Sequence, residues 1–293
     1  MSEMKALDAY WRNRALTYDW ISLGGLRVRE VSCGQGDALL FLHGFAGSLD
    51  DWLPIMKRLS VSYRCTAFEF PGSGLSMDLP ERYSLGFLVN LVKEYVAVKG
   101  LKRLSIIGLS LGAGVGIAAA PGLATNLQST VLVNPALLGR KLNVFIRICT
   151  LPLVGEILLW PNAATVKRYL RLCKAPGNEF PEDWVELRQE LAMYPGARTG
   201  VLSMLRSGIT LAGVKRGIRD ETRRALEKIA VPTLVIYGEQ DRFLPHEYAI
   251  SASNVIRNAR CIAFPDGGHT LPLEATEQLG GAIEEFLKSL TVE

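Results

Sequence analysis

Short apolar runs alternate with helix-like patterns over residues 1–135 and again over residues 226–293. The run at 38–42 is wholly apolar, which is typical of a strand covered on both faces of a sheet. Between Ser84 and Gly100 the apolar residues recur at helical spacing instead. We expect strands at 26–31, 38–42, 64–70, 104–109, 130–133, 232–237 and 260–264, and helices at 50–59, 85–99, 246–256 and 274–290, with a small-residue helix after 110. This alternation predicts an α/β fold with a mainly parallel central sheet flanked by helices.

The alternation stops between residues 136 and 225, where no strand pattern is convincing and prolines and glycines separate helical stretches. We therefore expect residues 1–135 and 226–293 to form a core domain, and residues 136–225 to form a helical cap inserted into it. The cap holds 15 Lys and Arg against 8 Asp and Glu. This basic excess favours an acidic ligand or an anionic membrane surface, unless it is only the solvated face of helices.

Composition narrows the class of protein. Of 293 residues, 48% are hydrophobic and 21% charged, as in soluble globular proteins, and the net charge is only +4. The N-terminal residues lack an apolar secretory segment, so we expect a cytoplasmic protein. Residues 104–139 carry no charge, but glycines and Pro121 interrupt them, and we expect buried strands and a helix there and no integral membrane span. Five scattered cysteines and three histidines predict no disulfide framework and no metal site, and we expect no nucleic-acid partner.

The clearest chemical motif is Gly108-Leu-Ser110-Leu-Gly112, which matches G-x-S-x-G. It follows an apolar strand directly and precedes the small-residue helix. A nucleophile on such a sharp strand-to-helix turn has a strained backbone, and larger side chains two residues away on either side would clash. The helix N-terminus behind the serine stabilises developing negative charge. Ser110 is therefore our candidate nucleophile.

A serine hydroxyl is a weak nucleophile at neutral pH and needs a base. Of the three histidines, His43 ends the strand at 38–42, His246 opens a helix, and His269 lies in a loop just after the last strand. Loops at the carboxyl ends of parallel strands are where such folds bind ligands. We therefore predict that His269 is the base.

The imidazole in turn needs a carboxylate that fixes its tautomer and stabilises its charged form. Asp241 directly follows the strand at 232–237, at a carboxyl end of the sheet, and is our candidate acid. Glu239 and Asp266 are the alternatives near the same edge. The oxyanion formed by attack also needs donors, and we assign the backbone amides of Phe45 and Leu111.

The order Ser110, Asp241, His269, with His43-Gly44-Phe45 upstream, resembles the α/β-hydrolase fold superfamily over roughly residues 20 to 290. Within it the chain resembles the capped group of serine esterases, lipases and carbon–carbon-bond hydrolases. The resemblance implies Ser110 as nucleophile, Asp241 as acid and His269 as base, without a metal or organic cofactor.

The sequence departs from that superfamily in one segment. Members usually carry an aspartate and a histidine where this chain has Glu69 and Ser73. We interpret this segment as structural, so the departure affects the expected chemistry little.

We expect the protein to cleave a small or medium apolar carboxylic ester through an acyl-enzyme. Phe145 and Trp160, in an apolar part of the cap, are candidate pocket residues, unless they only pack the cap on the core. Hydrolysis of a carbon–carbon bond in a vinylogous diketone, with Arg147, Arg168 or Arg171 holding a carboxylate, is the alternative. Thioester, lactone and amide hydrolysis, a receptor role for the same pocket, and a homodimer remain open.

Overall fold

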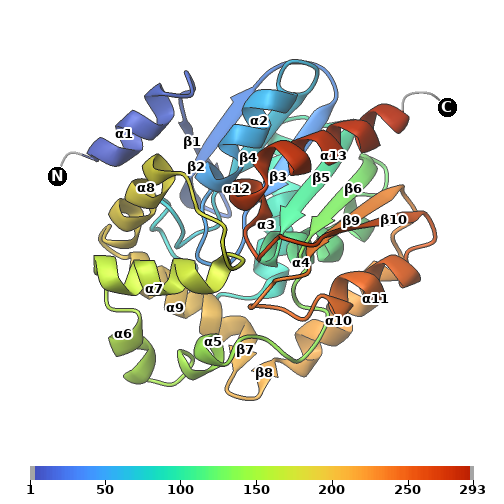
Figure 1. The fold of residues 1–293 in the computed structure, drawn as a ribbon. Coiled ribbons are helices and arrows are strands. Elements are labelled where there is room, and N and C mark those ends of the chain that lie inside the picture. The colour runs from blue at the N-terminus through green and yellow to red at the C-terminus, as the bar shows by residue number, and fades with distance from the viewer. Residues whose placement is uncertain (1–3, 291–293) are drawn as a thin grey trace.

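One eight-stranded sheet forms the centre of the computed structural model, which describes residues 4–290 (Figure 1). Its strands are β1 (Asp19–Leu23), β2 (Leu26–Cys33), β3 (Ala38–Leu42), β4 (Arg64–Phe68), β5 (Leu104–Leu109), β6 (Leu127–Val133), β9 (Thr233–Gly238) and β10 (Ala259–Phe264). Their order is β1-β2-β4-β3-β5-β6-β9-β10. Neighbours from β4 to β10 pair in parallel, whereas β1–β2 and β2–β4 are antiparallel. The predicted mainly parallel α/β fold is confirmed.

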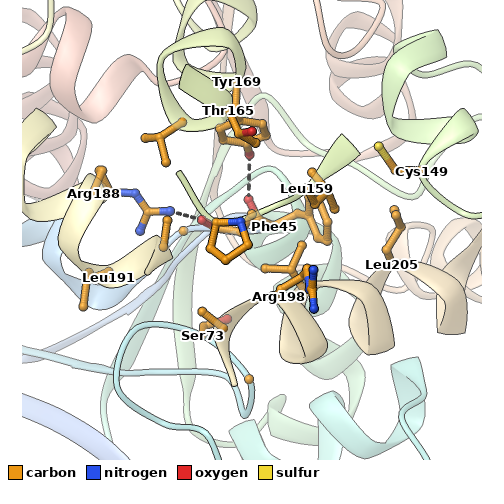
Figure 2. Close-up of a pocket in the computed structure, with 18 of the residues that line it drawn as sticks. Phe45, Ser73, Cys149, Leu159, Thr165, Tyr169, Arg188, Leu191, Arg198 and Leu205 are labelled. Atoms are coloured by element: carbon orange, nitrogen blue, oxygen red, sulfur yellow. Dashed lines mark hydrogen bonds between the residues drawn. The ribbon is translucent and has the colours of Figure 1, made fainter. Parts of the chain in front are cut away.

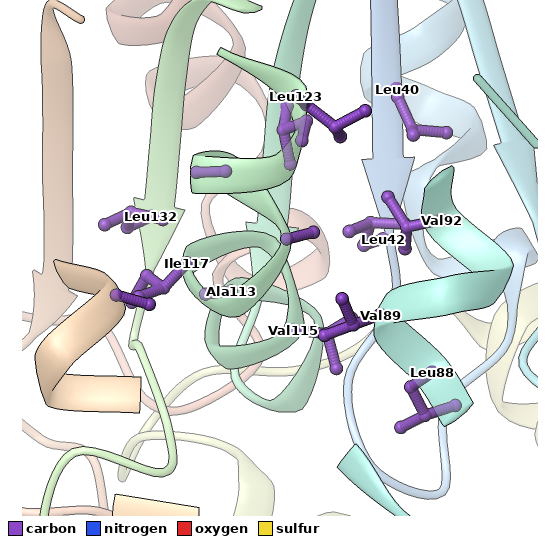
Figure 3. Packing of buried hydrophobic residues seen from close by; sticks show 14 of the residues in the cluster. Leu40, Leu42, Leu88, Val89, Val92, Ala113, Val115, Ile117, Leu123 and Leu132 are labelled. Carbon is purple, nitrogen blue, oxygen red and sulfur yellow. The ribbon is translucent and has the colours of Figure 1, made fainter. Parts of the chain in front are cut away.

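Helices cover both faces of this sheet, because successive strand residues point to opposite sides. Leu40 and Leu42 of β3 belong to one apolar layer, shown in part in Figure 3, and Leu39 and Phe41 belong to the other. The first layer is covered by α3 (Leu85–Val98), α4 (Leu111–Ala119), α10 (Arg216–Leu226) and α11 (Glu247–Val255). The second is covered by α1 (Lys5–Arg12), α2 (Leu53–Leu59) and α13 (Thr276–Ser289). Single helical turns lie at η1 (Leu49–Trp52), η2 (Ala120–Leu123) and α12 (Leu271–Glu274).

A helical insertion lies between β6 and β9 (Figure 1). It contains α5 (Val144–Ile148), α6 (Val154–Leu158), α7 (Ala163–Cys173), α8 (Glu182–Ala192), α9 (Ala197–Gly208) and a hairpin of β7 (Ile209–Thr210) and β8 (Gly213–Val214). The next helix, α10, packs against α4 and buries Leu226 in the core layer. We therefore propose that the cap ends near Val214 and not at residue 225.

The element boundaries differ from the predictions in ways that have physical causes. Strand β4 ends at Phe68 and not at residue 70, because the Phe70 amide turns away to donate to Nε2 of His43. The sequence analysis also missed α1, β1 and the β7–β8 hairpin, which are short or lie at the edge of the fold.

The uncharged stretch 104–139 forms β5, α4, η2 and β6 inside the core. Nowhere in residues 4–290 does a helix have both the length and the apolar character needed to cross a bilayer.

Candidate active site

Ser110 lies on a strained turn between β5 and α4. Its φ of 52° and ψ of −112° lie in a region that L-residues rarely adopt, and its side chain is buried. The two flanking glycines make this turn possible. A Cβ on Gly108 would lie 2.5 Å from the amide nitrogen of Ala113, and one on Gly112 would lie 2.2 Å from the carbonyl oxygen of Leu42. The turn therefore needs glycine at both positions.

The three residues that the sequence analysis selected for nucleophile, base and acid come together. The Ser110 hydroxyl lies 3.0 Å from Nε2 of His269, within hydrogen-bond reach of a proton acceptor. On the other side of the ring, Nδ1 lies 2.7 Å from Oδ2 of Asp241. The second oxygen of Asp241 accepts hydrogen bonds from the amides of Phe243 and Leu244, at 2.6 and 3.0 Å. The carboxylate is thus fixed on both oxygens and can hold the ring in one tautomer.

The alternative acids, Glu239 and Asp266, take no part in this contact. Both side chains are exposed, and the carbonyl oxygen of Asp266 accepts a hydrogen bond from Asn178 at 2.8 Å.

Several groups that the sequence analysis missed hold the loop of His269. The ring stacks on Phe243 with 4.8 Å between ring centroids and 17° between planes. The side-chain amide of Asn134 donates to the carbonyls of Gly268 and His269, and its oxygen accepts from the Gly238 amide at the end of β9. Asn134 therefore ties the histidine loop to the strand that leads to Asp241.

The cap also reaches the histidine loop. The His269 amide donates to the Cys173 carbonyl at the end of α7, at 2.8 Å. Glu274 accepts from the amides of Gly268 and Thr270 and, with the same carboxylate, from the amide of Ala175 on the cap. Glu274 thus joins the histidine loop to the segment that follows α7.

The loop after β3, residues 44–48, passes next to Ser110. A Cβ on Gly44 would lie only 3.4 Å from Cβ of Ser110, so the loop passes close to the serine. Within residues 4–290 the Phe45 amide has no hydrogen-bond acceptor. The Leu111 amide is the first of α4, one of those that a helix leaves without an internal partner. Both residues line the cavity at Ser110, and their amides stay the predicted oxyanion donors.

His43 supports this loop and is not a second base. Burial lowers its pKa to about 4, so the ring is neutral at neutral pH. Its Nδ1 donates to the Gly44 carbonyl at 2.8 Å, and its Nε2 accepts from the Phe70 amide at 2.9 Å.

Two cap side chains hydrogen-bond the 44–48 loop, as drawn in Figure 2, and a third binds just after it. The Tyr169 hydroxyl donates to the Phe45 carbonyl at 3.1 Å, and the Arg188 guanidinium donates to the Ala46 carbonyl. Trp184 donates its ring N–H to Asp51, just after the loop, at 3.1 Å. The cap therefore fixes the two peptide groups that follow the Phe45 amide, while His43 holds the Gly44 carbonyl of the peptide group that contains it.

Two apolar cavities lie between cap and core. The first, here called the serine pocket, contains Ser110 and is lined by aliphatic side chains of both parts, including Leu88, Leu137, Met204, Ile209 and Val214. The second, called the cap pocket, lies under α7–α9 and is lined by residues that include Met77, Leu159, Trp160, Tyr169, Leu191 and Arg198 (Figure 2). Phe45, Ile146 and Leu205 line both, so the two cavities adjoin.

The two predicted pocket residues have different positions. Trp160 lines the cap pocket, whereas Phe145 lines neither cavity. Phe145 packs inside the cap, and the Arg168 guanidinium carbon lies 4.9 Å from its ring centroid. Its neighbour Ile146 faces both cavities, because consecutive residues of a helix point about 100° apart. The pocket role of Phe145 stays a prediction, and Ile146 is the residue of α5 that lines both cavities.

Of the two departing residues, Glu69 belongs to a buried ionic cluster with Arg29 and Asp50. The Arg29 guanidinium, which is fully buried, pairs with both Asp50 and Glu69. Burial raises the pKa of Glu69, and the adjacent Arg29 opposes that rise. Asp50 also accepts from the hydroxyl of Ser48 at 2.7 Å. The cluster is structural support for the loop, while Ser73 lines the cap pocket.

Among residues 4–290 no group of three or more His, Cys, Asp or Glu side chains could hold a metal ion. The five cysteines are free thiols.

Comparison with known proteins decides the family. The profile of the alpha/beta hydrolase family matches residues 39–280, most of the chain. The chain belongs to the alpha/beta hydrolase family. Among its relatives, monoacylglycerol lipase abhd6-A of Xenopus laevis is 26% identical over 294 residues, covering 96% of this chain and 85% of that protein.

Solved structures of the same fold agree with this family. A putative lipase from Acinetobacter baumannii has a TM-score of 0.83 at 22% identity, with 100% of this chain and 98% of that one covered. A meta-cleavage product hydrolase from Pseudomonas fluorescens has a TM-score of 0.78 at 20% identity, with 94% and 98% covered. These alpha/beta hydrolase neighbours include both lipases and carbon–carbon-bond hydrolases, and at such identities they establish the fold alone.

Proposed function

We propose that this alpha/beta hydrolase is a serine hydrolase that cleaves small or medium apolar carboxylic esters. The observation that carries the proposal is the continuous contact from the Ser110 hydroxyl through both nitrogens of His269 to Asp241, with distances of 3.0 and 2.7 Å. Nucleophile, base and acid in this order of contact are the requirements for acyl transfer.

The proposed reaction begins when Nε2 of His269 takes the Ser110 proton as Oγ attacks the ester carbonyl. The Phe45 and Leu111 amides bind the resulting oxyanion, and Asp241 stabilises the imidazolium. His269 then gives its proton to the leaving alcohol, which departs and leaves an acyl-enzyme on Ser110. Water, activated by the same imidazole, hydrolyses the acyl-enzyme and releases the acid.

The lining of the serine pocket supports an apolar acyl group. Apart from Ser110 and Ser207, its side chains are apolar or, at Gly208, absent. Such a pocket removes an alkyl chain from water and holds it by dispersion and the hydrophobic effect.

The arginines required by the carbon–carbon-bond alternative lie elsewhere. Arg147 donates to the Leu211 carbonyl and Arg168 to the Leu158 carbonyl, and neither lines the serine pocket. Arg171 is exposed on α7. A carboxylate-bearing diketone would therefore find no arginine in this pocket, which favours the ester.

A panel of p-nitrophenyl esters of increasing acyl length tests the proposal, with a vinylogous diketone assayed in parallel. We expect multiple turnovers of the esters, no cleavage of the diketone, and loss of about 10⁶ in kcat for Ser110→Ala. Binding of esters without turnover would indicate a receptor, and preference for the diketone would overturn the substrate class. Retention of more than a tenth of the wild-type rate by Ser110→Ala would remove the assigned nucleophile.

A further inference from the structure

The cap carries an apolar surface around α6 that no other described part of the protein covers. Leu153, Ile157 and Trp160 are 75%, 71% and 58% exposed. Ile157 lies in α6, while Leu153 directly precedes this short helix and Trp160 follows it. Exposed Val144 and Leu151 precede them along α5 and the following turn. Scattered single apolar residues are ordinary on a protein surface, but a contiguous group is not.

The backbone at Leu153 does not favour leucine either. Its φ is +64°, in the left-handed region that glycine or asparagine adopts more easily. Both the exposure of this apolar side chain to water and its left-handed backbone conformation cost free energy. An apolar medium around its side chain would compensate for both.

Positive charge surrounds the apolar group. Residues 136–175 contain seven Lys and Arg and a single acidic residue, Glu156. Two hydrogen bonds from Arg206, of 2.7 and 2.9 Å, neutralise Glu156 and lower its pKa to about 2. On α7, which adjoins α6, Lys167 and Arg171 are exposed one turn apart.

One arginine contacts the apolar group, and another contacts the end of α6. The Arg198 guanidinium carbon lies 4.8 Å from the Trp160 ring centroid. Arg168 donates to the Leu158 carbonyl at the end of α6. A hydrocarbon centre with a basic rim is complementary to the interface of an anionic bilayer, where acyl chains lie beneath phosphate groups.

This surface is continuous with the cap pocket. Trp160, Leu159 and Arg198 line that cavity, and Trp160 is also part of the exposed group. In Figure 1, α5, α6 and the β7–β8 hairpin lie along the lower edge of the molecule. Arg147 on α5 donates to the Leu211 carbonyl in the hairpin turn, so these elements are joined.

We propose that the α6 surface, formed by Leu151, Leu153, Ile157 and Trp160, docks on an anionic lipid membrane. The apolar side chains enter the boundary between headgroups and acyl chains, while Lys167, Arg168 and Arg171 face lipid phosphates. In that orientation the cap pocket opens at the membrane. The binding itself does not depend on the proposed esterase activity.

Co-sedimentation of the full chain with vesicles tests this docking. The vesicles are phosphatidylcholine alone or phosphatidylcholine mixed with phosphatidylglycerol. We expect binding to the mixed vesicles, weakened by added salt. The apolar variant Leu153→Ser/Ile157→Ser should bind about ten-fold or more weakly, because two buried aliphatic side chains are removed. The charge variant Lys167→Glu/Arg171→Glu should bind the mixed vesicles about 10²-fold more weakly. Each basic group near an anionic membrane contributes its own electrostatic attraction, and both are reversed here.

The matched control is Val61→Ser/Val98→Ser, which removes two valines that are 88% and 59% exposed on the core. It should sediment like the wild type. All three variants should hydrolyse a water-soluble p-nitrophenyl ester at the wild-type rate, which separates lost docking from lost folding. Loss of esterase activity in Ser110→Ala with full vesicle binding would leave the docking proposal intact.

Three results would overturn the proposal. One is no binding of the wild type to the mixed vesicles, and another is equal binding by the apolar variant. The third is a wild-type dimer that becomes a monomer in Leu153→Ser/Ile157→Ser without vesicle binding by either, which would make this surface an interface between two copies of the chain.

Discussion

Asp241 differs from the nearby carboxylates in how completely its position is fixed. One oxygen faces His269 Nδ1 and the other accepts two backbone amides, whereas Asp266 is exposed in the histidine loop. A carboxylate that holds the imidazole in the correct tautomer contributes about 10⁴ to kcat in serine proteases. We expect Asp241→Asn to lose turnover on that order and Asp266→Asn to lose little. Steady-state kinetics of the two purified variants provide the comparison, and the reverse ranking would move the acid to Asp266.

His43 links the active-site loop to the pH dependence of stability. Its pKa in the folded protein is about 4, below the ordinary value of 6.5, because burial disfavours the imidazolium. The unfolded chain therefore binds this proton at a higher pH than the folded chain. The free energy of unfolding is therefore unaffected by His43 well above pH 6.5. Protonation of the unfolded chain lowers it by about 3 kcal/mol as the pH decreases to 4.

Urea unfolding at several pH values measures this effect. We expect the free energy of unfolding of the wild type to fall more steeply between pH 6.5 and 4 than that of His43→Gln, which lacks the titrating ring. Parallel slopes for the two proteins would mean that folding leaves the pKa of His43 unchanged.

At the scale of elements, α7 and α8 of the cap take part in shaping the active site. Their Tyr169 and Arg188 side chains hydrogen-bond the carbonyls of Phe45 and Ala46, next to the proposed oxyanion donor. The peptide planes of that loop therefore depend on the cap. The cap therefore affects the position of a proposed oxyanion donor, in addition to any effect of its apolar side chains on substrate selection.

We predict that Tyr169→Phe lowers kcat about ten-fold while KM changes little, because a misplaced donor costs most in the transition state. Tyr169 acts here as a positioning residue. The matched control is Tyr194→Phe, which removes the same hydroxyl from a cap tyrosine between α8 and α9. A tetrahedral inhibitor such as a trifluoromethyl ketone should also bind Tyr169→Phe more weakly. A change in KM alone would assign Tyr169 to substrate binding.

At the scale of the whole molecule, the Arg29 cluster joins elements that are far apart in the sequence. Arg29 on β2 pairs with Asp50 in η1 and with Glu69 after β4, and Trp11 of α1 donates to Asp50 at 2.7 Å. All these groups are buried. Removal of the cation would leave two carboxylates buried without their countercharge.

We expect Arg29→Met to lose about 3–5 kcal/mol of unfolding free energy, as is typical when one partner of a buried ion pair is removed. The control is Arg103→Met, whose partner Asp37 lies at an exposed site and should contribute less than about 1 kcal/mol. Urea denaturation of both variants measures the difference. Equal losses would show that burial does not distinguish the two ion pairs.

The parts of the fold that could be predicted are those encoded by local patterns. Wholly apolar runs indicated the central strands. The G-x-S-x-G motif indicated the turn at Ser110, because a side chain at either glycine would clash with nearby backbone. His269 and Asp241 followed from their positions after strands of a parallel sheet.

Contacts across the chain could not be predicted in the same way. Tyr169 lies 124 residues from Phe45, and Asn134 lies 135 residues from His269. No local pattern indicates such a pairing, because it depends on how the cap packs on the core. The sequence also did not indicate that Ile146 lines both cavities, since the rotation of a five-residue helix about its axis is set by its neighbours.

The most direct test of this account is covalent labelling with a fluorophosphonate, which reacts with an activated serine and not with an ordinary one. We predict that the reagent adds one phosphonyl group to the wild type, abolishes ester hydrolysis in proportion, and is found by peptide mass spectrometry on Ser110. Ser110→Ala should remain unlabelled, and His269→Ala should be labelled far more slowly. Labelling of a different residue, or equally fast labelling without His269, would contradict the proposed triad.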